Sequence, residues 1–420
     1  MNSLILSTFD VNGGAARAAF RLHKGLREMN VDSKMLVQYK SSDDSTVIGP
    51  QNKLEKWLNQ MRPTLDNLPL NFYPGDNGTF SPQWFPDLIE KKIKQLSPDI
   101  INIHWSCGYV QIESIAKFAK PLVWTFHDMW AFTGGCQYSG DCDRYLNTCG
   151  ACVQLTSPKE QDLSRWVWER KAKAWKDLNL TIVTPSVWLA NCAKASSLCK
   201  NFPVEVIPNG IDIQRYKPIN QNTAREWLNL PQNKQLILFG ATSTLDPRKG
   251  FNLLKSALQK LSQSGQQDNL ELVIFGASQP SLESDLGFKS HYIGNLSDDV
   301  SLALLYAAAD VFVAPSVQDN LPNTVMEALA CGTPCVAFDI GGMPDMIEHQ
   351  RNGYLAKPFD VESFAAGIAW VLSSDRFLSL RQRAREKVEK EFSLELQAQR
   401  YSKLFTQVIN TYHSRNTFLN

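Results

Sequence analysis

Short apolar runs alternate with helix-like patterns along almost the whole chain. The first run, Leu4–Phe9, precedes Ala15–Met29, where apolar residues recur at the spacing of an amphipathic helix. The later runs that predict strands are Lys34–Gln38, Asp99–His104, Pro121–Phe126, Leu180–Thr184, Gln235–Phe239, Leu270–Phe275, Val311–Ala314 and Pro334–Phe338. Continuous apolar strands separated by helices are typical of parallel sheets covered on both faces. The pattern predicts an α/β protein whose ligands bind beyond the carboxyl ends of its strands.

One segment near the middle of the chain separates two such patterns. Val206–Asp212 contains a proline and an Asn-Gly pair, and a polar stretch follows before strands resume. The chain has 420 residues, whereas single cores rarely grow beyond roughly 250–300 residues. We therefore expect two domains, residues 1–208 and 209–393, and a final helix over about 394–420.

The composition narrows the functional classes. A chain that is 43% apolar and 20% charged is ordinary for a soluble globular protein, and a net charge of +1 offers nucleic acid no global attraction. The first residues lack the basic start of a signal peptide, and no run approaches the ~18 apolar residues of a membrane span. Nine cysteines cannot all pair within one chain, which favours a reducing compartment. We expect a cytoplasmic protein that does not bind nucleic acid, and leave peripheral contact with the inner face of the plasma membrane open.

Two loops of the second half carry candidate ligand-binding chemistry. Arg248 and Lys249 lie in the polar loop between the strand that starts at Gln235 and the helix Phe251–Leu261. Two cations beside helix N-terminal amides fit a phosphate group, although a solvated basic turn gives the same pattern. Glu327 lies about one turn inside a second helix, where its carboxylate can accept from the neighbouring hydroxyls of a ribose or simply favour the helix dipole.

The first half offers candidates after its first strand and at two later strand ends. Gly13 and Gly14 open a helix and let backbone approach a ligand closely, as any tight turn also requires, and Arg17 follows them. His104 ends one strand, and His127 with Asp128 ends another. These are the positions at which an open parallel sheet holds ligands, although a lone histidine is more often structural.

The stretch Ala314–Pro334 resembles the signature of family 4 retaining glycosyltransferases, which have the GT-B fold. That signature has two acidic residues separated by seven others, and Asp319 and Glu327 occupy the two positions here. The resemblance implies that Glu327 binds the ribose of a nucleotide sugar and that Lys249 binds its diphosphate. It also implies that four loop and helix residues present amides to the donor: Asn320, Leu321, Asn323 and Thr324.

The resemblance extends over nearly the entire chain. It implies two Rossmann-like domains with parallel sheets facing across a cleft, and a final helix that packs back on the first domain. Gly13, Gly14 and His127 would then contact the donor, whereas Arg17, His104 and Asp128 would lie on the acceptor side. Catalysis would use His127, Asp319, Lys249 and Arg248, with no cofactor. Two positions depart from the family pattern: Asp319 replaces a glutamate and Ala241 replaces an arginine, for which we expect Arg248 to substitute.

The activity implied is sugar transfer from a UDP- or GDP-sugar to a glycan or lipid-linked acceptor in bacterial polysaccharide or glycoconjugate biosynthesis, with retention at the anomeric carbon. A nucleotide-sugar epimerase of the same fold and a non-catalytic sugar-nucleotide-binding protein stay open. A nicotinamide-dependent dehydrogenase is disfavoured, because no Gly-x-Gly-x-x-Gly follows the first strand of either half.

Two further segments have alternative interpretations. One is a loop with four cysteines, which fit either a structural zinc site or reduced, redox-sensitive thiols: Cys136, Cys142, Cys149 and Cys152. The other is Ser164–Asp177, in which three tryptophans alternate with basic residues. Such a helix fits either a membrane interface or, more commonly, a helix docked on its own sheet.

Overall fold

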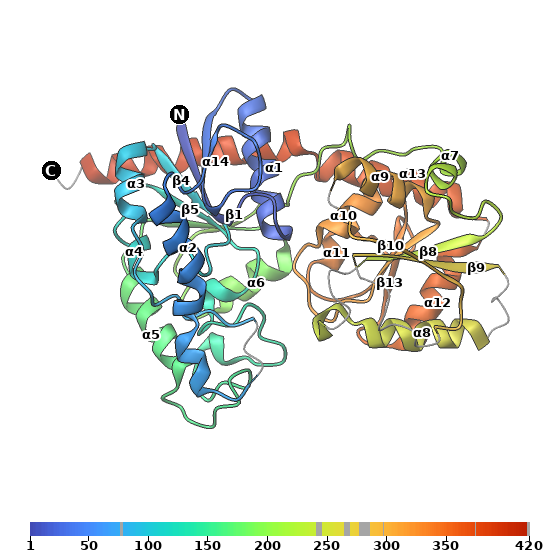
Figure 1. Cartoon of the computed structure of the whole chain (residues 1–420), viewed down its shortest axis with the longest axis horizontal. Coiled ribbons are helices and arrows are strands. Elements are labelled where there is room, and N and C mark those ends of the chain that lie inside the picture. The colour runs from blue at the N-terminus through green and yellow to red at the C-terminus, as the bar shows by residue number, and fades with distance from the viewer. Residues whose placement is uncertain are drawn as a thin grey trace. The chain divides into compact units, whose positions relative to one another are not determined.

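The computed structural model describes residues 1–75, 79–240, 246–263, 269–276, 286–296, 298–373 and 375–417. The chain forms two compact units, residues 1–208 with 397–420 and residues 209–396. Each unit is built around one parallel sheet with helices on both faces (Figure 1), so the predicted α/β architecture with two Rossmann-like domains is confirmed.

The first unit has a seven-stranded sheet in the order β3-β2-β1-β4-β5-β6-β7. Its strands are β1 (Asn2–Phe9), β2 (Asp32–Tyr39), β3 (Val47–Ile48), β4 (Ile100–Ile103), β5 (Leu122–Thr125), β6 (Leu180–Thr184) and β7 (Val204–Val206). The five longer strands match predicted apolar runs. The edge strands β3 and β7 escaped prediction because two or three residues give no recognisable pattern.

Alternate side chains of this sheet enter two separate cores. Leu4 and Leu6 face one core and Ile5 the other, as the two-residue period of a strand requires. The first core is covered by α3 (Ile89–Leu96), α4 (Ile112–Ile115), α5 (Leu163–Trp175) and α6 (Val187–Ala195). The second is covered by α1 (Gly14–Glu28) and the C-terminal α14 (Leu394–Thr417), drawn in red in Figure 1. The helix α2 (Lys53–Asp66) and three short turns, η1 (Leu68–Phe72), η2 (Trp130–Phe132) and η3 (Arg144–Leu146), complete the unit.

The second unit has a six-stranded sheet in the order β10-β9-β8-β11-β12-β13. Its strands are β8 (Gln235–Gly240), β9 (Leu270–Phe275), β10 (Ser290–Gly294), β11 (Val311–Ala314), β12 (Cys335–Phe338) and β13 (Gly353–Ala356). The two outermost strands were not predicted, because β10 is only partly buried and polar, and β13 begins with glycine. The strands β8, β11 and β12 lie side by side, so the loops that follow them meet at one edge.

Two helical layers enclose this second sheet. One contains α9 (Asp299–Ala308), α10 (Asn323–Ala330) and α13 (Phe377–Glu391), and the other contains α8 (Phe251–Gln263) and α12 (Val361–Leu372). Shorter elements are α7 (Gln221–Trp227), η4 (Pro247–Lys249) and α11 (Met343–Met346). Among the described residues of both units, no helix combines the length and apolarity needed to cross a membrane.

Candidate functional site

The loop after β8 is pressed against the loop after β11. Asp246 caps the turn η4 by accepting from the amide of Arg248 at 3.0 Å. Gly250 has φ of 68°, and a Cβ there would lie 1.9 Å from the carbonyl oxygen of Pro315. The amide of Val317 also donates to the carbonyl of Arg248 at 2.8 Å. Only glycine permits this approach, which fixes where the two cations of η4 can reach.

The predicted cations and the first acidic residue of the signature come together in the structure. Lys249 Nζ lies 2.7 Å from Asp319 Oδ2, and Arg248 Nη1 lies 3.4 Å from the same oxygen. Asp319 is 6% exposed. Burial alone would raise the pKa of this carboxyl, but the charges of Lys249 and then Arg248 outweigh it, so the pKa is lowered. A buried carboxylate therefore orients both cations at the strand edge.

The backbone around Asp319 is fixed by the loop after β12. Gly341 has φ of 54°, and a Cβ there would lie 2.0 Å from the carbonyl oxygen of Asp319. The amide of Gly342 donates to that carbonyl at 3.2 Å, and the amide of Asn320 donates to Asp319 Oδ1 at 3.1 Å. The part of these two glycines in shaping the site depends on contacts that no local pattern reveals.

The second acidic residue of the signature is buried on α10. Glu327 is 2% exposed, and its Oε2 accepts from the hydroxyl of Tyr306 at 3.1 Å. Burial, followed by the nearby carboxylate of Glu327, raises the pKa of Tyr306 well above its ordinary value, so this phenol stays a hydrogen-bond donor. Tyr306, from α9, was not predicted because its helix reads as plain core. Its hydroxyl donates to the carboxylate of Glu327, the residue that the resemblance implies binds the ribose.

The remaining predicted donor residues lie around the start of α10. Asn320 and Leu321 are buried, whereas Asn323 and Thr324, which begin the helix, are partly exposed. The amides of a helix start are suited to an anionic or oxygen-rich ligand. Ala241, where the family has an arginine, lies outside the described residues.

In the first unit, the two predicted histidines contact each other at the ends of adjacent strands. His104 follows β4, His127 follows β5, and His104 Nδ1 lies 2.8 Å from His127 Nε2. His104 is 2% exposed, and His127 is partly exposed. Burial lowers the pKa of His127 to about 4 and, together with the neighbouring imidazole, lowers that of His104 well below its ordinary value. Both rings are therefore neutral at pH 7.

Other predicted residues of this unit occupy the same end of the sheet. Asp128 accepts from the indole of Trp105 at 3.1 Å and from the amide of Trp130 at 2.8 Å. Gly13 has φ of 92° and precedes α1, and the carbonyl of Gly13 accepts from the amide of Arg17. Gly14 is the first residue of α1 and is exposed.

Asp10, directly after β1, was missed by sequence reasoning. It is fully buried and accepts from the amides of Val11, Ser41 and Ser42 at 2.8–3.1 Å. It thereby joins the loops after β1 and β2. An aspartate that ends an apolar strand was the available signal.

The four clustered cysteines lie in the segment that follows η2 and contains η3. Over the described ranges, which include every cysteine, no three His, Cys, Asp or Glu side chains are placed to hold a metal ion. Cys149 Sγ instead accepts from the amide of Gly134 at 3.1 Å. Burial raises the pKa of Cys136 to about 12 and that of Cys149 to about 11, so both are thiols rather than thiolates. Zinc and reduced thiols both stay predictions for this loop.

The basic tryptophan helix is docked on its own sheet. On α5, Val167 and Trp175 are buried, and Lys171 is fully buried. Lys171 Nζ donates to the carbonyls of Trp130 and, at 3.0 Å, Thr133, and lies 3.4 Å from the centre of the Trp130 ring. The helix thus holds the segment that follows His127 and Asp128, and it does not offer a continuous apolar face to a membrane.

Comparison with known proteins gives two family matches. The model described as Glycosyltransferase Family 4 matches residues 12–215, and the model described as Glycosyl transferases group 1 matches residues 220–391. Together these ranges contain most of both sheets and every predicted site residue.

Among similar curated proteins is a D-inositol 3-phosphate glycosyltransferase of Geodermatophilus obscurus, 30% identical over 67% of this chain and 61% of its own length. Another is the UDP-Gal:alpha-D-GlcNAc-diphosphoundecaprenol alpha-1,3-galactosyltransferase of Escherichia coli, 24% identical over 49% of this chain and 54% of its own length. The matches span 42% of the length of one inositol-phosphate relative and 62% of another.

Similar solved structures support the GT-B fold. Sucrose-phosphate synthase from Thermosynechococcus elongatus is 17% identical, with a TM-score of 0.69 over 98% of this chain and 100% of that one. Anabaena HepE in complex with UDP is 18% identical, with a TM-score of 0.66 over 97% of this chain and 100% of that one. At these identities the likeness shows the fold alone.

Proposed function

The chain belongs to the group 1 glycosyltransferases, and from this premise we propose that it transfers a sugar from a UDP- or GDP-sugar to a glycan or lipid-linked acceptor, with retention at the anomeric carbon. The observation that carries the proposal is the cluster of Lys249, Arg248 and Asp319 beside the start of α10. The relatives named for inositol phosphate and for a diphosphoundecaprenol-linked sugar support sugar transfer as the reaction class.

Sugar transfer requires positive charge near the diphosphate, which is the leaving group. When the bond between the anomeric carbon and the diphosphate breaks, negative charge develops on the diphosphate oxygens. We propose that Lys249 and Arg248, held at the strand edge by Asp319, and the first amides of α10 stabilise that charge without a divalent cation. Such preorganised donors need no rearrangement as the charge appears.

Recognition of the nucleoside falls to Glu327. Its carboxylate already accepts from Tyr306 at 3.1 Å, and an ionised carboxylate has about four acceptor positions. We propose that it accepts from the ribose hydroxyls while Tyr306 holds its orientation. His127 and the loop of Gly13 and Gly14 complete the proposed contacts to the sugars, with Arg17, His104 and Asp128 on the acceptor side.

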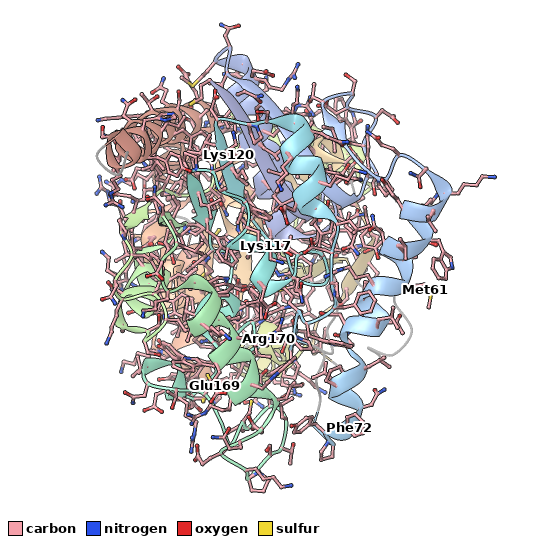
Figure 2. The ribbon with its side chains drawn as sticks, turned by 90° about the vertical axis from the view of Figure 1, so that its left-hand side faces the viewer. Met61, Phe72, Lys117, Lys120, Glu169 and Arg170 are labelled. Carbon is pink, nitrogen blue, oxygen red and sulfur yellow. The ribbon has the colours of Figure 1, made fainter. Side chains whose placement is uncertain are left out.

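We propose bacterial polysaccharide or glycoconjugate biosynthesis as the setting, with peripheral contact at the inner face of the plasma membrane. The surface that supports this proposal is α2 rather than the tryptophan helix. Four exposed apolar side chains follow one face of α2 at helical spacing: Leu54, Trp57, Leu58 and Met61. Figure 2 shows Met61 on the outer side of α2 and Phe72, which is 87% exposed, at the end of the segment that follows.

The charge around this stripe fits an anionic lipid surface. Lys53 and Lys56 of α2 are exposed, whereas Glu55 is engaged by Lys92 at 2.7 Å. An exposed tryptophan among leucines, with lysines alongside, is typical of a helix that lies in a membrane interface. The surface would keep the protein close to a lipid-linked acceptor.

The donor site is tested by titration calorimetry with UDP, GDP and their glucose and mannose derivatives, followed by transfer assays. Lys249→Met removes one of the positive charges that would face the diphosphate, so we expect the rate of sugar transfer to fall roughly 100-fold or more. Glu327→Gln should weaken binding of the nucleoside diphosphate itself. The matched control is Lys260→Met, which removes an exposed lysine of the same unit that pairs with Glu362.

The outcomes separate the competing functions. Unchanged binding and transfer in Lys249→Met and Glu327→Gln would refute the proposed site. Isomerisation of the donor in the absence of acceptor would favour the epimerase. Tight donor binding without turnover across acceptors would favour the non-catalytic binding protein.

A further inference from the structure

A continuous series of buried polar groups runs from His127 into the sheet of the first unit. His127 Nε2 lies 2.8 Å from His104 Nδ1, and His104 Nε2 lies 2.8 Å from Asn102 Oδ1. The Asn102 amide nitrogen lies 3.0 Å from Thr125 Oγ1, which is 2.9 Å from the hydroxyl of Tyr401 on α14. The four groups behind His127 are at most 2% exposed.

The direction of each hydrogen bond follows from one backbone carbonyl. Asn102 Nδ2 lies 3.2 Å from the carbonyl oxygen of Val123, an atom that can only accept. This fixes the orientation of the Asn102 amide, with its oxygen toward His104. Because that oxygen also only accepts, His104 Nε2 must carry a hydrogen.

The protonation of the second ring nitrogen then depends on whether His104 is charged. A fully enclosed imidazole beside a second imidazole is strongly disfavoured as a cation, and burial lowers the pKa of His104 well below its ordinary value. With Nε2 protonated and the ring neutral, Nδ1 of His104 is a hydrogen-bond acceptor. The atom opposite it, His127 Nε2, must therefore be the donor.

We propose that His104 is a positioning residue that fixes His127 as the Nε2–H tautomer, so that His127 presents Nδ1 as an acceptor to the sugar substrates. The tautomer rests on the geometry of Asn102, His104 and Val123 and on the neutral state of the enclosed His104 ring, whereas its use on a sugar rests on the proposed function. A group that forms a hydrogen bond with His127 Nδ1 must be the donor. A sugar hydroxyl fits this requirement, whereas the carboxylate of a uronic acid does not.

The hydrogen bond that His104 accepts from His127 can be separated from the space that its side chain fills. A carbonyl oxygen placed where Nδ1 lies would direct the same tautomer, and the side chain of asparagine puts its oxygen near that place. An aliphatic side chain fills the space but leaves His127 Nε2 without its acceptor. His104→Asn and His104→Leu therefore form a matched pair that separates hydrogen bonding from volume.

The test is nitrogen NMR of the full chain with 15N-labelled histidine at pH 7, in which protonated and unprotonated ring nitrogens have well-separated shifts. The resonances of His127 are assigned by their loss in His127→Asn. We expect the wild type to show His127 with Nε2 protonated and Nδ1 unprotonated, and His104→Asn to preserve that state. His104→Leu should give a mixture of tautomers.

The second measurement is transfer kinetics with the same variants, compared for a neutral-sugar donor and its uronic-acid counterpart. We expect kcat with the neutral sugar to fall roughly tenfold in His104→Leu, the scale of one lost hydrogen bond, and to recover in His104→Asn. The wild type should discriminate against the uronate.

The two measurements fail separately. A wild-type spectrum with Nδ1 of His127 protonated overturns the proposal, even if neither His104 variant folds. The Nε2–H tautomer in His104→Leu also overturns it, because His104 would then not be its cause. If the spectra agree but no sugar is transferred, the positioning role stands and the proposed function is wrong.

Discussion

We predict that the fully buried Lys171, which contacts the segment that follows His127, makes the folding stability of the protein depend on pH. Its ammonium is held by two backbone carbonyls and the face of Trp130. Burial lowers the pKa of Lys171 from 10.5 to about 7, with the nearby cysteines acting weakly against the shift. Lys171→Met keeps most of the side-chain volume and removes the ionisable group.

The sign follows from proton binding. Between pH 7 and 10.5 the unfolded chain holds a proton on Lys171 that the folded chain has mostly released, so folding stability rises with pH. The free-energy cost of burying the charged ammonium reduces folding stability fully below pH 7, and this cost disappears as the pH approaches 10.5. Between pH 7 and pH 9 the wild type should gain about 2 kcal/mol relative to Lys171→Met.

The assay is urea unfolding at pH 7 and pH 9, followed by the fluorescence of the cluster that contains Trp124, Trp130 and Trp175. The observable is the change with pH in the difference between the two unfolding free energies. Lys173→Met, an exposed lysine on the same helix, should show no such change. Parallel pH dependences of wild type and Lys171→Met would refute the reasoning.

Two further predictions concern the second unit and the proposed membrane surface. Gly250→Ala places a Cβ 1.9 Å from the carbonyl of Pro315, so we expect weaker nucleotide binding and a loss of about 1–3 kcal/mol. The control is Gly294→Ala: φ there is 75° and an added Cβ would have no atom within 4 Å, so this variant should lose only the free energy of backbone strain. Equal losses of stability in the two variants would contradict the argument that the Cβ of Gly250→Ala clashes with Pro315. Trp57→Ser should reduce binding to vesicles that contain phosphatidylglycerol about tenfold in cosedimentation. Trp227→Ser, which alters a tryptophan that is 69% exposed, should not, and equal losses would count against α2 as the surface.

The central strands were predictable because burial on both faces makes them continuously apolar. Val311–Ala314 and Leu270–Phe275 match the predicted runs to the residue. The edge strand β10, with Ser290 and His291, carries no such signal, since solvent relaxes the demand for apolar side chains. The sequence therefore predicted the middle of each sheet and not its margins.

The candidate site was predictable as a set of positions and not as a set of contacts. His104 and His127 were expected at strand ends, but their hydrogen bond depends on the pairing of β4 with β5. Tyr306 supports Glu327 from another helix, and Gly341 fits against Asp319 from another loop. Such partners are far apart in sequence, so spacing alone could not reveal them.

The cysteine loop shows a limit of the same kind. Four thiols within a short segment left both zinc and reduced thiols open. In the structure Cys149 accepts from the amide of Gly134, which is packed against the backbone of Ser164. Spacing in sequence predicts neither this contact nor the choice between the two interpretations.

The C-terminal helix has a consequence for how the chain acquires its structure during synthesis. Tyr401 and Phe405 of α14 complete the core that contains Ile5 and Val123, although almost two hundred residues of the second unit intervene. We therefore expect that on the ribosome this core is covered by α1 alone until α14 emerges. The second unit has no such dependence, and it can reach its final form earlier than the unit that precedes it.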